Sequence, residues 1–190
     1  MDPGPGAVDC CSSPIVIDLA GDGFDLSSLE EGVSFDLDAD GEKEWTAWTA
    51  VLSDDAFLVL DRNGNGRIDN GTELFGDRTP QLFSDVANGY RALSVFDLPE
   101  QGGNGDGWIS LADAVYRDLR LWIDTNHDGL SQPDEITTLQ AQGVKALRLQ
   151  YLESRRRDRY GNEFRYWSRV ERWARRPFVL SVDVFFRVLR

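Results

Sequence analysis

The stretch IDTNHDGLSQPDEI, residues 123–136, carries the clearest structural signal in the chain. Oxygen-bearing side chains recur at every second residue, a glycine follows them, and a glutamate comes six positions after the glycine. A short loop with this spacing can surround a hard cation with six to eight oxygens, because the glycine permits the sharp central turn. We therefore predict a calcium loop. The predicted ligands are Asp124, Asn126, Asp128, the carbonyl of Leu130, and Glu135.

Apolar residues at helical spacing flank this loop on both sides. Leu111, Val115, Leu119 and Trp122 precede the loop, and Ile136 and Leu139 follow it. Ser110 and Ser131 are each followed three residues later by an aspartate, which is a helix start signal, and Gly143 is a stop signal. The pattern predicts a helix on each side of the loop, as in an EF-hand. His127 falls at a loop position that we expect to face solvent.

A second acidic loop precedes the first by one predicted helix. Its predicted ligands are Asn104, Asp106, the carbonyl of Trp108, and Asp113. The first position of the motif falls on Gly102, which has no side chain, so Asp97 or Glu100 would have to reach in. The helix leaving this loop would be the helix entering the loop at Asp124, and the two loops would then form an EF-hand-like pair.

A third acidic loop follows an apolar run, residues 57–60, that predicts a short strand. Its predicted ligands are Asp61, Asn63, Asn65, the carbonyl of Arg67, Asp69 and Glu73. The closing carboxylate of Glu73 arrives one residue later than the motif requires. The sequence therefore predicts a variant of the calcium loop that is entered from a strand.

Two further acidic turns match the motif less well. Asp36, Asp38 and Asp40 precede Gly41, with Glu42 and Glu44 behind them, and we predict the three aspartates as ligands. Asp18 and Asp22 precede Gly23, but Ala20 stands where an oxygen is needed. The sequence thus predicts between three and five calcium loops.

The charge of the chain is divided between its two parts. The formal net charge is −13, yet residues 1–142 carry 28 acidic and 7 basic side chains, whereas residues 143–190 carry 5 acidic and 13 basic ones. Bare carboxylates as close as these repel one another, so we expect poor folding without cations. The Arg-rich part suits a protein partner or an anionic surface, or its arginines pair with acids of the same fold. We do not expect a nucleic-acid partner.

The predicted fold class is α+β, with EF-hand-like loops on short strands and helices and an antiparallel β element at the C-terminus. Residues 1–13 are rich in Gly, Pro and Ser and predict a flexible tail. Residues 14–142 form the predicted calcium-binding module. Residues 143–190 alternate in polarity and predict Arg-rich strands packed on the module, with a turn near Tyr160-Gly161-Asn162. No run is long and apolar enough to cross a bilayer, and the N-terminus lacks a signal peptide.

Five segments together resemble the calcium-dependent self-processing module of repeat-in-toxin (RTX) proteins. They are SPIVIDLAGDGFDL, FLVLDRNGNGRIDNGTELFGD, NGYRAL, GNGDGWISLADA and LRLWIDTNHDGLSQPDEITTL, which span roughly residues 14–149 in the family's order. The tail ESRRRDRYGNEFRYWSRV resembles the end of related EF-hand-like modules in large secreted bacterial proteins. The resemblance implies cleavage of an Asp-Pro bond at the module's edge when calcium folds it. Here Ser13 precedes Pro14, and the chain's Asp-Pro pair is Asp2-Pro3, in the predicted tail.

The leading hypothesis is a calcium-binding structural module of a secreted bacterial protein, with Ca²⁺ as its bound ion and no enzymatic activity. The chain would then be either part of a larger exported protein or exported without a signal peptide. A second hypothesis is calcium-dependent autoproteolysis at an Asp-Pro bond. A third is an adhesion or toxin-delivery module that binds its partner through the Arg-rich part.

Overall fold

A computed structural model describes residues 8–9, 12–82, 86–174 and 176–189. The chain is mostly β, so the α+β fold class predicted above is wrong. Within the described residues there is one α-helix, α1 (Gly89–Ser94), and three single 3₁₀ turns, η1 (Val95–Asp97), η2 (Pro99–Gln101) and η3 (Ala114–Arg117). None of these helices is long and apolar enough to cross a membrane.

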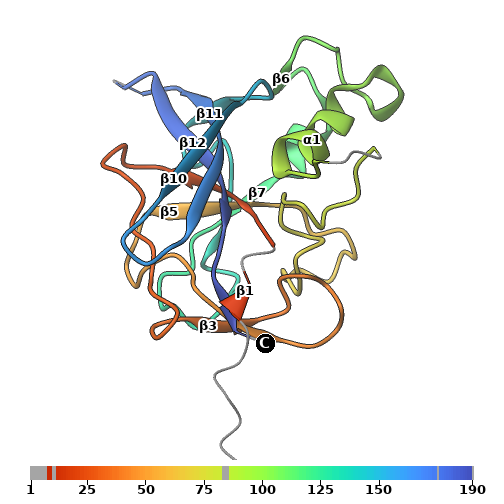
Figure 1. Cartoon of the computed structure of the whole chain (residues 1–190). Coiled ribbons are helices and arrows are strands. Elements are labelled where there is room, and N and C mark those ends of the chain that lie inside the picture. The colour runs from red at the N-terminus through yellow and green to blue at the C-terminus, as the bar shows by residue number, and fades with distance from the viewer. Residues whose placement is uncertain (1–7, 10–11, 83–85, 175, 190) are drawn as a thin grey trace, which may run out of the picture.

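The larger sheet has nine strands. Eight of them follow the order β6-β9-β11-β12-β2-β5-β7-β8, and the ninth, β10, pairs with β11 outside this order. Its strands are β2 (Ile15–Asp18), β5 (Asp55–Val59), β6 (Trp108–Ser110), β7 (Arg120–Trp122), β8 (Ile136–Thr138), β9 (Val144–Arg148), β10 (Leu152–Arg157), β11 (Glu163–Arg172) and β12 (Phe178–Phe185). The smaller sheet has the order β1-β13-β4-β3, from β1 (Val8–Asp9), β13 (Val188–Leu189), β4 (Glu44–Thr46) and β3 (Val33–Phe35). It lies below the larger sheet in Figure 1.

Two strands, β2 and β5, form the centre of the fold because every residue in both is buried. Their side chains alternate between two apolar cores. Ile15 and Ile17 belong to the core that α1 covers, together with Tyr90 and Leu93 of that helix. Val16 and Phe57 belong to the second core, on the opposite face. Apolar runs buried on both faces are typical of central strands.

The second core is a cluster of large aromatic rings. Trp48, Phe57 and Trp122 are fully buried, and the ring centroids of Trp48 and Phe57 lie 4.3 Å apart. Phe35 and Phe186 complete the cluster at 5.1 and 5.7 Å from the ring of Trp48. Such close ring pairs add to the stability gained from burial alone. Trp48 and Trp122 of this cluster also contact the loop at residues 124–135.

The C-terminal strands continue the same sheets as the N-terminal ones. Strand β12 pairs with β2, where Ser181 lies opposite Ile17, and β13 pairs with both β1 and β4. Strands form where the sequence alternates in polarity, and the β10–β11 hairpin turns at residues 158–162. Residues from both ends of the chain therefore share one hydrogen-bonded framework.

The two helices predicted around residues 124–135 are absent. Strand β7 enters this loop and β8 leaves it, and the two pair directly, with Trp122 opposite Ile136. Leu111, expected on the buried face of a helix, is 41% exposed. Residues 114–117 make only the turn η3. Pairing of β7 with β5 keeps residues 120–122 extended, so the loop closes a β-hairpin.

Candidate metal centre

Four acidic turns share one pattern of backbone hydrogen bonds. At residues 124–129, Oδ1 of Asp124 accepts the amide of Asp128 at 3.1 Å, and Oδ2 accepts the amide of Gly129 at 2.9 Å. Asp18, Asp36 and Asp61 each accept the amides four and five residues later in the same way. The glycine at the sixth position has a positive φ in each, 69° at Gly129, which favours glycine.

The loop at residues 124–135 gathers its predicted side chains. Asn126 accepts the amide of Asp128 at 3.0 Å, and Asp128 accepts the amide of Leu130 at 2.8 Å. Oε1 of Glu135 accepts the amide of Thr125 at 3.0 Å, so this carboxylate folds back to the start of the loop. Side chains from the start and the end of the loop therefore both accept amides of its backbone.

Two buried tryptophans attach this loop to the aromatic core. The indole nitrogen of Trp48 donates to Oδ2 of Asp124 at 2.9 Å, and that of Trp122 donates to Oε2 of Glu135 at 3.3 Å. Asp124 is only 1% exposed. His127, expected in solvent, is half-buried, with its ring nitrogens 2.6 and 2.5 Å from carbonyls of Thr49 and Glu31. The first and last acids of the loop are thus held by the core.

The loop at residues 61–73 closes on Glu73 despite the extra residue. Glu73 is 2% exposed, and its carboxylate accepts the amides of Arg62 at 3.0 Å and Asp69 at 2.8 Å. The amide groups of Asn63 and Asn65 donate to Oδ2 of Asp69 at 3.1 and 2.6 Å. The amide of Arg67, whose carbonyl is a predicted ligand, donates to Oδ1 of Asn65 at 2.8 Å. All the predicted ligand residues of this loop therefore lie in one turn.

The loop at residues 104–113 takes its first acid from Asp97. The Asp97 carboxylate accepts the amides of Gly105 and Gly107, both at 2.9 Å, and so fills the position that Gly102 leaves empty. At Gly103 an added Cβ would lie 2.2 Å from the Asp97 backbone, so only glycine allows this approach. The backbone of Trp108 enters β6 here, and its amide donates to Oδ1 of Asp106 at 2.9 Å. Asp113 closes the loop by accepting the amide of Asn104 at 3.2 Å.

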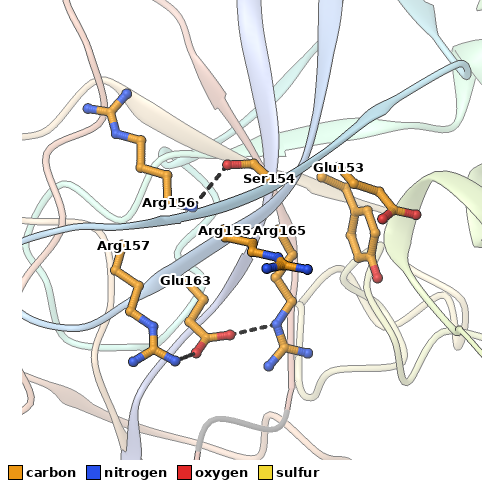
Figure 2. A pocket seen from close by; sticks show the side chains of 8 residues that line it. Glu153, Ser154, Arg155, Arg156, Arg157, Glu163 and Arg165 are labelled. Atoms are coloured by element: carbon orange, nitrogen blue, oxygen red, sulfur yellow. Dashed lines mark hydrogen bonds and ion pairs between the residues drawn. The ribbon is translucent and has the colours of Figure 1, made fainter.

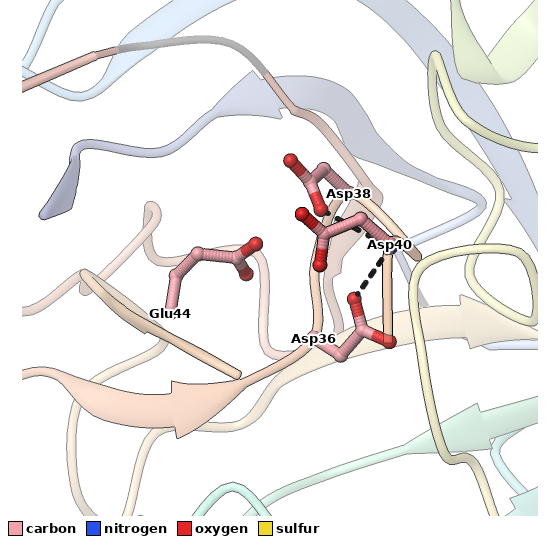
Figure 3. A group of neighbouring side chains, drawn as sticks. All are labelled: Asp36, Asp38, Asp40 and Glu44. Atoms are coloured by element: carbon pink, nitrogen blue, oxygen red, sulfur yellow. Dashed lines mark hydrogen bonds between the residues drawn. The ribbon is translucent and has the colours of Figure 1, made fainter. Parts of the chain in front are cut away.

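The two turns with the weaker sequence signals form the tightest carboxylate clusters among the described residues. Asp36, Asp38, Asp40 and Glu44 each offer an oxygen within 4.8 Å of the others (Figure 3). Asp18, Asp22 and Asp54 form a second such cluster. Oδ2 of Asp54 accepts the amide of Ala20 at 2.5 Å. Asp54 thus places a carboxylate oxygen at the loop position where the Ala20 side chain has none. Its sequence position, more than thirty residues away, gives no local signal for this role.

The crowding of these acids changes their proton affinity. Burial raises the pKa of Asp36, and burial together with the charge of Asp38 raises that of Glu44. Burial raises the pKa of Asp55 to about 7, helped by the charges of Asp54 and Asp18. A cation placed among these carboxylates would have the opposite effect, because it favours their charged forms.

Three of the turns meet along one cleft of about 780 Å³. Its walls include Asp36, Asp69 and Gln132, one from each of the loops at residues 36, 61 and 124. The amide of Ile68 donates to the hydroxyl of Ser131 at 2.7 Å across this cleft. The acidic turns therefore contact one another and brace parts of the chain far apart in sequence.

The Ser13-Pro14 peptide is buried against a loop that follows β5. The amide of Ser13 donates to Asp77 at 2.8 Å, and the Ser13 hydroxyl accepts the Asp77 amide at 3.2 Å. A Cβ at Gly76 would collide with the Ser13 carbonyl, so the two segments touch through their backbones. Asp2-Pro3, the predicted alternative cleavage point, lies outside the described residues.

Two comparisons with known proteins place the chain. The family model described as "SPM domain" matches residues 15–186. The iron-regulated protein FrpA of Neisseria meningitidis serogroup C is 43% identical over 141 residues, which is 73% of this chain and 12% of the relative. Neither description indicates catalytic activity. Because the family model covers most of the chain, this protein belongs to the SPM domain family.

Proposed function

We propose that this chain is a calcium-binding structural module of a bacterial protein that acts outside the cell. The observation that carries the proposal is the repeated turn: four separate loops hold an aspartate on the amide five residues later, and a fifth loop holds Asp97 on the amides of Gly105 and Gly107. These hydrogen bonds fix each carboxylate within its own loop. The repetition argues for one shared ligand.

The donor set fits calcium better than a transition metal. All the side chains that the five loops bring together are carboxylates and amides, and such oxygen ligands suit Ca²⁺ and Mg²⁺. Oε1 of Gln132, at the ninth position of the loop that starts at Asp124, is buried and has no hydrogen-bond partner in the part of the chain that the structure describes. Calcium takes a ligand at this position in the EF-hand, often through water. Twelve-residue loops of variable closure also suit the flexible coordination of calcium more than the strict octahedron of magnesium.

The asparagine amides add a specific expectation. In the described arrangement the amide nitrogens of Asn63 and Asn65 donate to Asp69, and that of Asn126 donates to Asp128 at 3.1 Å. A turn about the last side-chain bond would exchange the nitrogen and oxygen of each amide, at the cost of the loop amide that each oxygen now accepts. A bound calcium ion would interact with the carboxylates of Asp69 and Asp128 directly. The hydrogen bonds that the asparagine amides donate to these carboxylates would then no longer be required.

The role of the ion is structural in this proposal. Two carboxylates about 4 Å apart repel by roughly 1 to 4 kcal/mol, depending on how far water screens them. The clusters at residues 36–44 and 18–54 each contain several such pairs within 4.8 Å. Their sum is comparable with the whole stability of a domain. Binding of a cation to the folded state stabilises it by mass action, so the module would fold where calcium is millimolar.

A chelator titration tests the proposal. We expect the circular dichroism spectrum of a folded β protein in millimolar calcium, and loss of that spectrum or a large fall in Tm when EDTA is added. Restoring calcium should restore both. An unchanged spectrum and an unchanged Tm in EDTA would refute the structural role.

Self-cleavage is a separate hypothesis that the residues at the module's edge argue against. The Asp-Pro chemistry implied by the resemblance needs a carboxylate on the residue before Pro14, and Ser13 has only a hydroxyl. The intact mass of the wild-type chain should therefore stay constant in calcium. The variant Ser13→Asp restores the required residue type, and we expect it to lose residues 1–13 in calcium but not in EDTA. Cleavage of the wild-type chain would contradict this part of the proposal.

A further inference from the structure

A pocket of about 420 Å³ lies on the β10–β11 hairpin, and none of its lining residues belongs to an acidic turn. It is lined by four arginines, Arg155, Arg156, Arg157 and Arg165, and by two glutamates, Glu153 and Glu163, so these side chains carry a net charge of +2. This excess of positive charge is local, because the chain as a whole has a formal net charge of −13. A positively charged pocket points to an anionic ligand.

Irregular pairing of the hairpin shapes this pocket. The register between β10 and β11 shifts between Glu153 and Arg156, and that between β11 and β12 shifts between Phe164 and Tyr166. Such bulges bend a strand and redirect its side chains. Figure 2 shows Arg155, Arg157 and Arg165 with Glu163 on one side of the hairpin and Arg156 on the other. Three guanidinium groups are thereby gathered on one side of a two-stranded ribbon.

Two of these guanidinium groups are held in place. Nε of Arg165 lies 2.7 Å from Oε2 of Glu163, and the Arg165 guanidinium lies over the ring of Phe185, 3.8 Å from its centre. Arg157 pairs with the other oxygen of Glu163. Burial acts to raise the pKa of Glu163, but its bonds and charge interactions with Arg165 and Arg157 lower it overall. One carboxylate therefore holds two arginines of the pocket.

Arg155 completes the arrangement as a group available for a ligand. Its side chain lies against this pocket and is exposed, and within the described part of the chain it has no hydrogen bond or ion pair. A guanidinium group offers five donors in a planar fork that matches the oxygens of phosphates and carboxylates. The donors of Arg155 can therefore turn to a ligand without breaking a contact in the protein.

We propose that this pocket binds a phosphate group, as carried by a phosphomonoester. The four arginines and two glutamates that line the pocket have a net charge of +2, and a phosphomonoester carries about −1.5 to −2 at neutral pH with three acceptor oxygens. A carboxylate, with a single charge and two oxygens, would leave part of the site uncompensated. This site is independent of the acidic turns and does not rest on their binding calcium.

The test is a titration with glycerol phosphate in about 2 mM calcium, a concentration typical of extracellular fluids, followed by NMR of the ¹⁵N-labelled chain. We expect saturable shifts confined to amides of β10 and β11 and to the arginine Nε–H signals. Arg155→Gln should weaken binding about tenfold, as for loss of a charge-assisted contact. The matched control is Arg159→Gln, which removes the same charge from the turn of the same hairpin. The Arg159 side chain lies over the ring of Tyr160 and does not line the pocket.

Three outcomes would overturn the proposal. They are the absence of saturable shifts in these strands, equal weakening by Arg155→Gln and Arg159→Gln, and acetate binding as tightly as glycerol phosphate. A second arm uses phosphatidylcholine vesicles with and without phosphatidic acid, which has the same phosphomonoester group. Vesicle binding that Arg155→Gln reduces and Arg159→Gln does not would identify a lipid as the source of the phosphate. Binding of glycerol phosphate alone would identify a soluble ligand.

Discussion

Replacement of Asp183 by asparagine should stabilise this protein, and the gain should grow as the pH rises. Asp183 lies in β12, is completely buried, and accepts the amide of Gly89 at 2.7 Å through Oδ2. Its other oxygen has no hydrogen-bond partner among the described residues. Burial, helped by the charge of Asp77, raises the pKa of Asp183 from 3.8 to about 7. Asparagine has the shape of the protonated acid and never ionises.

The sign and size of the effect follow from this shift. Unfolding lets the Asp183 carboxyl ionise near its ordinary pKa, so the folded state holds the extra proton and loses stability as the pH rises from about 4 to 7. At about 1.4 kcal/mol for each pKa unit, the cost is about 2 kcal/mol at pH 5 and about 4 kcal/mol at pH 8. The advantage of Asp183→Asn should therefore increase by roughly 2 to 3 kcal/mol between these two pH values. Comparing two pH values cancels any constant cost of the new amide group.

Urea unfolding at pH 5 and pH 8, in saturating calcium, measures this difference. Under the proposed function, saturating calcium would keep the acidic turns in one state at both pH values, so that their titration would not mask that of Asp183. Asp118→Asn is the matched control, because Asp118 is exposed and its replacement should change stability equally at both pH values. If the advantage of Asp183→Asn is the same at pH 5 and pH 8, the reasoning about a buried neutral carboxyl is wrong.

Three substitutions test individual loops. Glu135→Gln should remove one bound calcium ion, because it takes the closing charge from the loop that begins at Asp124, and native mass spectrometry would count the loss. Trp48→Phe should destabilise the calcium-bound protein by about 1.5 to 3 kcal/mol in urea unfolding, since Asp124 loses a buried charge-assisted hydrogen bond. Asp54→Ala should remove the ion near Asp18, as seen in the same ion count, because Asp54 belongs to that cluster.

Each of these variants has a matched control variant that should behave like the wild type. Asp134→Asn changes an exposed acid beside Glu135, and Trp45→Phe changes a tryptophan that is 43% exposed. Asp25→Ala removes an acid that is exposed and outside the cluster of Asp54. Equal effects of a test variant and its matched control would show that the loss reflects general charge or packing and not the loop.

The acidic loops could be read from the sequence because their geometry is local. An aspartate that accepts the amides four and five residues later needs only a glycine at the turn, and both residues are close in the chain. The same reasoning failed for Asp54, which reaches Ala20 from another segment. For the first position of the loop at residues 104–113, the sequence left Asp97 and Glu100 as alternatives. The segment between Asp97 and this loop is longer than the motif, so either carboxylate could reach the position.

The helices could not be decided by spacing alone. Leu119 and Trp122 are three residues apart, which suits a helix, but Leu119, Leu121 and Trp122 are all buried, as in a strand between two cores. What fixes the strand is pairing with β5, a partner more than sixty residues earlier. The pairing of β2 with β12 joins residues more than 160 apart and has no local signal at all. The order of the strands in the sheet could therefore not be predicted from the sequence.

The most direct test of calcium binding by this chain is native mass spectrometry with calcium and with EDTA. The repeated turns predict at least three bound calcium ions, all removed by EDTA, together with a shift of the charge-state distribution toward that of an unfolded chain. A protein that binds no calcium at millimolar concentrations, and keeps the same compact charge states in EDTA, would contradict the proposed function.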